Sequence, residues 1–276
     1  MKKHGSTIFL VLILLIGLSL MLYPSFADWW NSVHQSRAII DYDQALADMN
    51  EADYSAFFEQ AHDYNRRIKE IDFPLMYHED VPGYMEALNL TGNGIMGYIE
   101  IPKISISLPI YHGTSEPVLQ VAVGHLEGTT LPTGGVGNHC ALSAHRGLPS
   151  ARLFTDLDKM EVGDIFTLTV LDRVLTYEVD QILIVEPQDV EPLYPVEGED
   201  LCTLVTCTPY GINTHRMLVR GRRIENIEEQ RVIHVTADAI QIEPVIVAPL
   251  VAAPMLLVLL IALLIPKPKK NRRKDV

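Results

Sequence analysis

The sequence predicts a mainly β domain, a closed β-barrel with short helices, which follows a helical segment and is flanked by two transmembrane helices. Over residues 95–224, short runs of β-branched and aromatic residues recur between Gly, Pro and Asp, a spacing typical of a barrel. An apolar stripe at helical spacing precedes these runs. An uncharged apolar block also stands near each end of the chain, and both blocks are candidate membrane spans.

The first apolar block covers residues 7–23 and follows Lys2 and Lys3. It lies at the lower limit of spanning length, and we expect residues 1–23 to form a cytoplasmic tip and an uncleaved signal anchor. The alternative is the core of a cleaved signal peptide, because "SFA" at 25–27 offers a small-x-small cleavage site.

The second apolar block predicts a transmembrane helix over residues 244–266, reached through a linker at 227–243 and followed by a basic tail at 267–276. Positively charged flanks stay on the cytoplasmic side of a membrane. Both termini are therefore expected inside the cell, in a two-pass protein of the cell membrane, with residues 24–243 outside.

Charge and cysteine content limit the range of possible partners and cofactors. The flanks hold eight of the 22 Lys and Arg and one of the 35 Asp and Glu, which leaves residues 24–243 with a formal charge of −20. Such a surface argues against nucleic acid as a partner. Three cysteines, Cys140, Cys202 and Cys207, leave at least one thiol without an intrachain partner. Neither Cys-x-x-Cys nor His-Glu-x-x-His occurs, so we expect no metal or other cofactor.

Within the outer segment, residues 31–71 are expected to be helical and residues 72–90 to form a loop, because Pro74 and Pro82 interrupt the pattern. Together these make a helical segment at 24–93, before a barrel at 94–226. The helix carries a stripe that needs a surface to pack on: Tyr54, Phe57, Phe58, Ala61, Tyr64 and Ile68. Within the barrel, only short helical stretches are expected, at 115–121 and 150–160.

The stretch "HCALSAH", residues 139–145, is expected to be a strand. Side chains alternate between the two faces of a strand. Cys140 then shares an apolar face with Leu142 and Ala144 and belongs to the core. His145 comes where the strand ends, in a position to titrate and to transfer protons.

The stretch "LCTLVTCTPYGINTHRMLVRGRRI" predicts two strands joined by a loop. A hairpin-like return brings Cys207, at the end of the first strand, close to Arg216, at the start of the second. Cys202 points to the opposite face and belongs to the core. A thiolate with a proton donor and an arginine for an oxyanion can perform nucleophilic catalysis. His145, His125 and His215 are all candidate partners, and spacing does not choose among them.

These residues also carry a family resemblance. "TLVTC" matches the Thr-Leu-x-Thr-Cys signature of sortases, and "TLVTCTPYGINTHRMLVRGRR" resembles the pilin-polymerising class C group. "MGYIEIPKISISLPIYHGTSE", "GHLEGTTLPTGG", "LSAHRGLPSARLFTDLDKM" and "YEVDQI" are similar to the same group. The resemblance covers about residues 94–224, and the two-ended membrane topology also suits class C.

The resemblance implies a sortase β-barrel in which Cys207 is the nucleophile, His145 the general acid and base, and Arg216 the stabiliser of the oxyanion or substrate. It implies cleavage of the Thr–Gly bond of a Leu-Pro-x-Thr-Gly sorting signal in a pilin. A lysine amine of the next pilin then resolves the thioester, and no cofactor is needed. Thr206 is expected to line the substrate groove; the alternative is an ordinary strand threonine.

The sequence differs from the class C pattern in the region of the lid. Class C enzymes usually cover the cysteine with a loop anchored by Asp-Pro-aromatic, whereas this chain has Asp72-Phe73-Pro74. We expect residues 72–90 to form a lid-like loop, with Asp72 or Phe73 as its plug. The alternative is an ordinary turn that ends the helix.

Two other functions stay open at this point. One is a sortase that anchors surface proteins to peptidoglycan, with a cell-wall precursor as the acceptor partner. The other is a non-enzymatic membrane-anchored surface protein, but "IQIEPVIVAP" contains no Leu-Pro-x-Thr-Gly before the second apolar block.

Overall fold

The computed structural model describes residues 5–47 and 49–226. Residues from Asp28 onward form one compact unit, and the described residues before Asp28 belong to another. The predicted linker, second transmembrane helix and basic tail, residues 227–276, lie outside the described residues.

The chain begins with a long helix, α1 (Gly5–Ala47), which passes through Pro24 without ending. Within the part of the chain that the structure describes, Phe9–Ala47 is the one helix long and apolar enough to cross a membrane. None of the residues in its apolar window is buried. The structure therefore contains an N-terminal apolar helix, as expected, and it supports one of the two predicted spans.

The helical structure predicted over residues 31–71 is found in most of this range, but the structure divides it into two helices. α1 ends at Ala47 and α2 (Glu51–Ile68) starts anew. Asn50 and Asp53 cap the start of α2 reciprocally: the Asn50 side chain accepts from the Asp53 amide at 3.3 Å, and the Asp53 carboxylate accepts from the Asn50 amide at 3.1 Å. This exchange satisfies amides that a helix start leaves unpaired, and so favours a new helix here.

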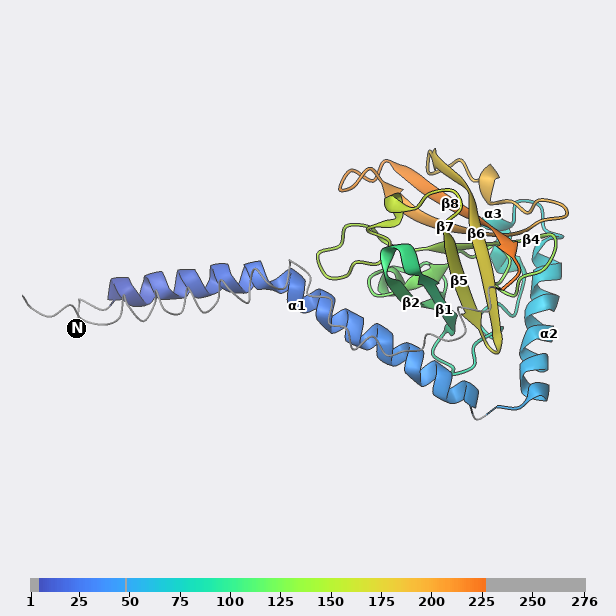
Figure 1. Cartoon of the computed structure of the whole chain (residues 1–276), viewed down its shortest axis with the longest axis horizontal. Helices are drawn as coiled ribbons and strands as arrows, with labels where there is room; N and C mark the ends of the chain where they lie inside the picture. The colour runs from blue at the N-terminus through green and yellow to red at the C-terminus, as the bar shows by residue number, and fades with distance from the viewer. Residues whose placement is uncertain (1–4, 48, 227–276) are drawn as a thin grey trace, which may run out of the picture. The chain divides into compact units, whose positions relative to one another are not determined.

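The predicted apolar stripe of α2 packs on the barrel, and Figure 1 shows α2 lying beside the β-sheet. Phe58, Ala61, Tyr64 and Ile68 are buried in the same hydrophobic cluster as the barrel core. The C-terminal part of α1 is fixed separately, through Tyr42, whose hydroxyl donates to the Met96 carbonyl at 2.9 Å.

Eight strands form the barrel, and the closed architecture predicted from the sequence is confirmed. The sheet closes in the order β1-β2-β3-β4-β7-β8-β6-β5. The pairs β2–β3 and β4–β7 are parallel, and the other neighbours are antiparallel. The strands are β1 (Ile95–Ile101), β2 (Ile106–His112), β3 (Val123–His125), β4 (Asn138–Ser143), β5 (Ile165–Val170), β6 (Arg173–Val185), β7 (Asp200–Thr208) and β8 (His215–Ile224).

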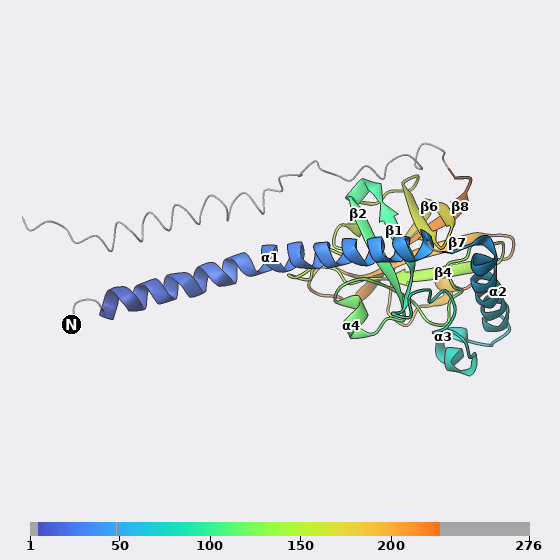
Figure 2. The same ribbon diagram turned by 90° about the horizontal axis from the view of Figure 1, so that it is seen from below.

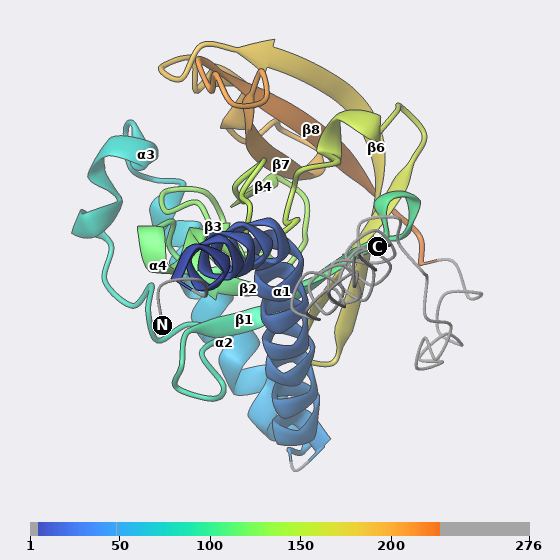
Figure 3. The same ribbon diagram turned by 90° about the vertical axis from the view of Figure 1, so that its left-hand side faces the viewer.

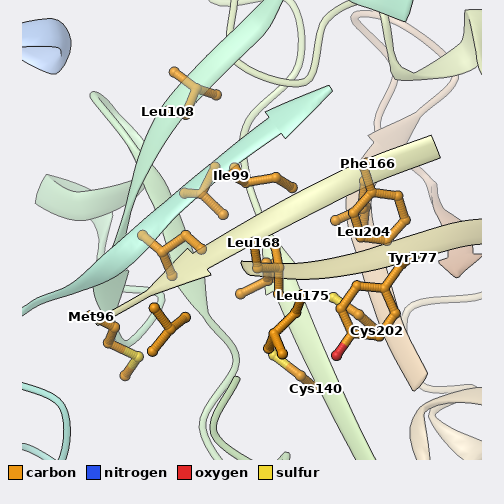
Figure 4. Close-up of a cluster of buried hydrophobic side chains, with 14 of the residues drawn as sticks. Met96, Ile99, Leu108, Cys140, Phe166, Leu168, Leu175, Tyr177, Cys202 and Leu204 are labelled. Carbon is orange, nitrogen blue, oxygen red and sulfur yellow. The ribbon is translucent and has the colours of Figure 1, made fainter. Parts of the chain in front are cut away.

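Apolar side chains from the strands fill the barrel, and Figure 4 shows ten of them labelled. Cys140 and Cys202 are paired in the parallel β4–β7 register, and both are buried among these side chains near Tyr177. Both belong to the core, as the alternation of their strands predicts.

Short helices and turns connect the elements. α3 (Pro74–Tyr77) and η1 (His78–Asp80) lie between α2 and β1, and α4 (Glu116–Leu119) lies between β2 and β3. α3 and α4 lie on the same side of the barrel (Figure 2 and Figure 3). The remaining 3-10 turns are η2 (Pro102–Ile104), η3 (Leu157–Lys159) and η4 (Glu191–Leu193).

Candidate active site

The candidate site lies on the outer face of the sheet formed by β4, β7 and β8. Alternation along β7 places Cys207 on the same face as Val205, while Leu204 points into the core. In the antiparallel β7–β8 register, Cys207 is paired with Arg216 and Val205 with Leu218. The hairpin-like return predicted from the sequence therefore brings Cys207 and Arg216 directly opposite each other.

Of the three thiols, only that of Cys207 is partly open to solvent. None of the three cysteines is in a disulfide. Cys140 and Cys202 are 2% and 0% exposed, whereas Cys207 is half-buried. Burial in the barrel raises the pKa of Cys202 well above its ordinary value. A reagent or substrate in solution thus meets Cys207 first.

His145 follows β4 by two residues and continues its parallel register with β7. Ser143 is paired with Val205, and the Ala144 amide donates to the Val205 carbonyl at 3.2 Å. Extending this register brings His145 beside Cys207. Its side chain is 27% exposed, and its carbonyl accepts from the Phe154 amide at 3.1 Å, which holds the following loop.

Thr206 occupies the opposite face from Cys207 and is 1% exposed. Its hydroxyl donates to the Ala144 carbonyl at 2.9 Å. This position agrees with the alternative interpretation, a strand threonine that holds the backbone, rather than with a groove-lining side chain. The bond fastens the residue before His145 to the residue before Cys207, so it fixes the spacing of the two.

Arg216 is the second residue of β8 and is half-buried. Its Nη1 donates to the backbone carbonyls of Asn213 at 3.3 Å and His215 at 3.1 Å, both in or next to the β7–β8 loop. These bonds hold the guanidinium beside its own strand, and its remaining N–H groups can reach a ligand over Cys207.

The two rival histidines lie away from the face of β7 that carries Cys207. His125 is 0% exposed, and both of its ring nitrogens are engaged, Nδ1 with the Tyr84 hydroxyl at 2.9 Å and Nε2 with the Thr130 carbonyl at 3.0 Å. His215 neighbours Arg216 in β8 and so points to the other face of the strand. Of the three candidates, His145 is the one that shares a face with Cys207.

An apolar floor extends from Cys207 along this face. Ala141, Val205, Leu218 and Leu193 form a separate hydrophobic cluster outside the barrel core. Leu75, from the segment before β1, packs against this cluster. The backbone of this segment also approaches the β3–β4 loop so closely that a Cβ at Gly128 would lie 2.5 Å from the Pro74 carbonyl.

The expected plug residues are not the ones that cover the floor. Asp72 and Phe73 are exposed, Phe73 by 65%, and Phe73 has a left-handed φ of 56°. Both line a cavity of about 540 Å³, which Leu75 and the floor residue Leu193 also line, but neither Cys207 nor Arg216 lines it. Leu75 enters the apolar cluster instead, two residues after Phe73.

A carboxylate beside His145 was not expected from the sequence. Glu116, at the start of α4, places Oε2 3.5 Å from Nε2 of His145. The two residues stand in different elements of the chain, and no motif spacing links them. Over the described residues, no group of three or more His, Cys, Asp or Glu side chains is arranged to hold a metal ion.

Comparisons with known proteins agree with this geometry. The family model for the sortase domain matches residues 99–224. The crystal structure of sortase C1 from Streptococcus agalactiae is 50% identical, with a TM-score of 0.64; the match covers 69% of this chain and 100% of that chain. Sortase C from Streptococcus pneumoniae is 46% identical, with a TM-score of 0.61, over 69% of this chain and 97% of that chain.

Among curated proteins, sortase A of Streptococcus agalactiae serotype III (strain NEM316) is 34% identical over 117 residues. That match covers 41% of this chain and 47% of the relative, so the chain spans about half the length of that protein. The closed barrel and these matches define a sortase domain. The chain belongs to the sortase family, and its structural neighbours are class C sortases.

Proposed function

We propose that this chain polymerises pilins as a membrane-anchored sortase. It cleaves the Thr–Gly bond of a Leu-Pro-x-Thr-Gly sorting signal and joins the threonine to a lysine amine of another pilin. The observation that carries the proposal is the shared outer face on which Cys207 and Arg216 are paired and His145 follows in register. The resemblance of the chain to class C sortases supports the pilin as substrate.

The reaction follows from these three side chains. The Cys207 thiolate attacks the threonine carbonyl carbon, and the Arg216 guanidinium stabilises the oxyanion that forms. The C–N bond then breaks, and the His145 imidazolium gives its proton to the departing glycine amine. A lysine amine attacks the resulting thioester and returns a proton to His145, and the thiolate leaves with an isopeptide bond formed.

The apolar cluster of Ala141, Val205, Leu218 and Leu193 is the proposed binding floor for the Leu-Pro part of the signal. It lies on the Cys207 face and begins two residues before the thiol. Leu75 packs on the same floor, so residues 72–90 would act as a lid that substrate must displace. Leu75 takes the role that we expected of Asp72 or Phe73.

The proposed location follows from the apolar helix and the sequence. An N-terminal anchor and a second span at 244–266 would hold both termini in the cytoplasm and the barrel outside the cell membrane. Substrates already exported and still tethered to the membrane would then share a surface with the enzyme, which raises their effective concentration.

The test is pilin assembly by the full chain in detergent micelles. Wild type and Cys207→Ala are each incubated with a pilin that carries the sorting signal, and products are resolved by denaturing gel electrophoresis and mass spectrometry. Ladders joined through lysine, present only with wild type, would support the proposal. Transfer of the signal only to a peptidoglycan-type amine would favour the anchoring function. No covalent product with either acceptor would contradict both.

A further inference from the structure

One ring nitrogen of His145 has no hydrogen-bond partner although it is buried. The Nε2 atom is shielded from solvent and makes no hydrogen bond. A buried polar atom without a partner is costly, and it is rare in native proteins. The ionic group beside it is the Glu116 carboxylate, whose Oε2 lies 3.5 Å away, a few tenths of an ångström beyond a well-formed hydrogen bond.

Glu116 is held in place from its own side. Its other oxygen, Oε1, accepts a hydrogen bond of 2.5 Å from Nε2 of Gln120. This bond, together with the charge of His145, holds the pKa of Glu116 below its ordinary value. The carboxylate is therefore ionised at neutral pH, and one oxygen remains to accept from the imidazole.

The turn that carries Glu116 is fixed against the barrel. A Cβ at Gly124 of β3 would lie 2.3 Å from the Gly113 carbonyl and 3.2 Å from Leu119, so the segment around α4 packs directly on the β3 backbone. The neighbouring Arg146 is engaged elsewhere, because its guanidinium pairs with Asp158 at 2.6 Å. Glu116 thus faces His145 without a competing cation from that residue.

We propose that Glu116 is a positioning residue for His145. It accepts the Nε2–H, and this fixes the orientation of the ring and directs proton exchange with the substrate through Nδ1. Its negative charge lies beside the ring that gives the proton to the leaving amine. The inference rests on the proposed transpeptidase function and adds a carboxylate to its Cys207, His145 and Arg216 site.

The geometry sets the size of the effect. The Glu116 side chain is 68% exposed, so the pair contributes little to stability. Proton transfer by a positioned side chain contributes about 10²- to 10⁴-fold to a rate, and a misoriented ring loses part of this. We expect Glu116→Ala to lower kcat by roughly tenfold. KM should stay nearly constant because Glu116 does not contact the substrate in this scheme.

The experiment uses the full chain in detergent micelles, with a Leu-Pro-x-Thr-Gly peptide and an amine acceptor. Glu116→Ala removes both charge and acceptor, and Glu116→Gln removes the charge alone. Gln120→Ala keeps the Glu116 carboxylate but removes the hydrogen bond that holds its Oε1. Glu59→Gln, on the exposed face of α2, is the matched control for the loss of one negative charge. Circular dichroism checks that each variant is folded.

A second readout does not depend on turnover. The ring nitrogen signals of His145, followed by NMR in histidine-labelled protein, report the bond at Nε2. We expect a hydrogen-bonded Nε2–H in wild type that is lost in Glu116→Ala. The kcat should be highest in wild type, lower in Glu116→Gln and lowest in Glu116→Ala. Glu59→Gln should change neither the ring signal nor kcat. An unchanged ring signal together with an unchanged kcat would overturn it. If wild type transfers no peptide but the ring signal still responds to Glu116→Ala, the positioning contact stands and the proposed function fails.

Discussion

Replacing Leu75 by Ala should speed access to Cys207, because Leu75 is the side chain of the proposed lid, residues 72–90, that packs on the apolar floor. It packs against the cluster of Ala141, Leu193, Val205 and Leu218, which lies on the same face as the nucleophile. Phe73 and Met76, on either side in the lid, are 65% and 71% exposed. The closed position of this segment therefore depends on Leu75 more than on its neighbours.

The magnitude follows from how far Leu75 is buried. Full burial of a leucine side chain contributes about 1.5–3 kcal/mol. Leu75 is half-buried, which halves this contribution, and Ala keeps one carbon of the side chain, so the closed state should lose about 0.5–1 kcal/mol. Since 1.4 kcal/mol is tenfold in an equilibrium constant, the open fraction should rise roughly two- to fivefold.

Alkylation by iodoacetamide, followed by digestion and mass spectrometry, measures access to Cys207 without any substrate. The buried Cys140 and Cys202 serve as internal references, since they should stay unlabelled while the barrel is folded. Met76→Ala is the matched control and should react as wild type does. Equal labelling rates for Leu75→Ala and wild type would refute the reasoning, because they would show that the floor contact does not hold the lid.

Three further predictions follow from other contacts. Thr206→Val removes the hydrogen bond to the Ala144 carbonyl, so the free energy of unfolding, measured with denaturant, should fall by about 1 kcal/mol and thioester formation should slow. Unchanged values of both would contradict the anchoring role of Thr206. Tyr42→Phe removes a hydroxyl that donates to the Met96 carbonyl and accepts from the Leu171 amide at 2.8 Å, so the free energy of unfolding should fall by about 1–3 kcal/mol. A smaller loss in denaturant unfolding would show that α1 is held by packing alone. Burial lowers the pKa of His112 below its ordinary 6.5, so the unfolded chain takes up this proton more readily. The part of the stability that depends on His112 should therefore decrease as pH falls below 6.5, and His112→Gln, compared with wild type by thermal unfolding at pH 7 and 5, should lose less; equal losses would contradict this assignment.

The barrel is predictable from the sequence because its strands carry local signals. Short β-branched runs between turn residues mark each strand, and alternation along β4 and β7 is enough to assign Cys140 and Cys202 to the core. The loop "TPYGIN" also predicts the return that pairs Cys207 with Arg216. In each case the relevant residues lie in one strand or in two consecutive strands.

Other parts of the site depend on contacts between distant segments. Glu116 reaches His145 only because β3 and β4 are neighbours in the closed sheet. Leu75 reaches the floor only because the segment before β1 folds back over β4 and β7. No local spacing encodes either contact. The division between α1 and α2 is different, because the reciprocal cap formed by Asn50 and Asp53 is a local signal that the sequence itself contains.

The most direct test of the account is the intact mass of the full chain after brief incubation with a Leu-Pro-x-Thr-Gly peptide. The account predicts an adduct of the peptide up to threonine, located on Cys207 and removed by an added amine with formation of the amide. The adduct should be absent in Cys207→Ala. An adduct that persists in Cys207→Ala, or no adduct with wild type even after the lid is opened by Leu75→Ala, would contradict the assignment of Cys207 as the nucleophile.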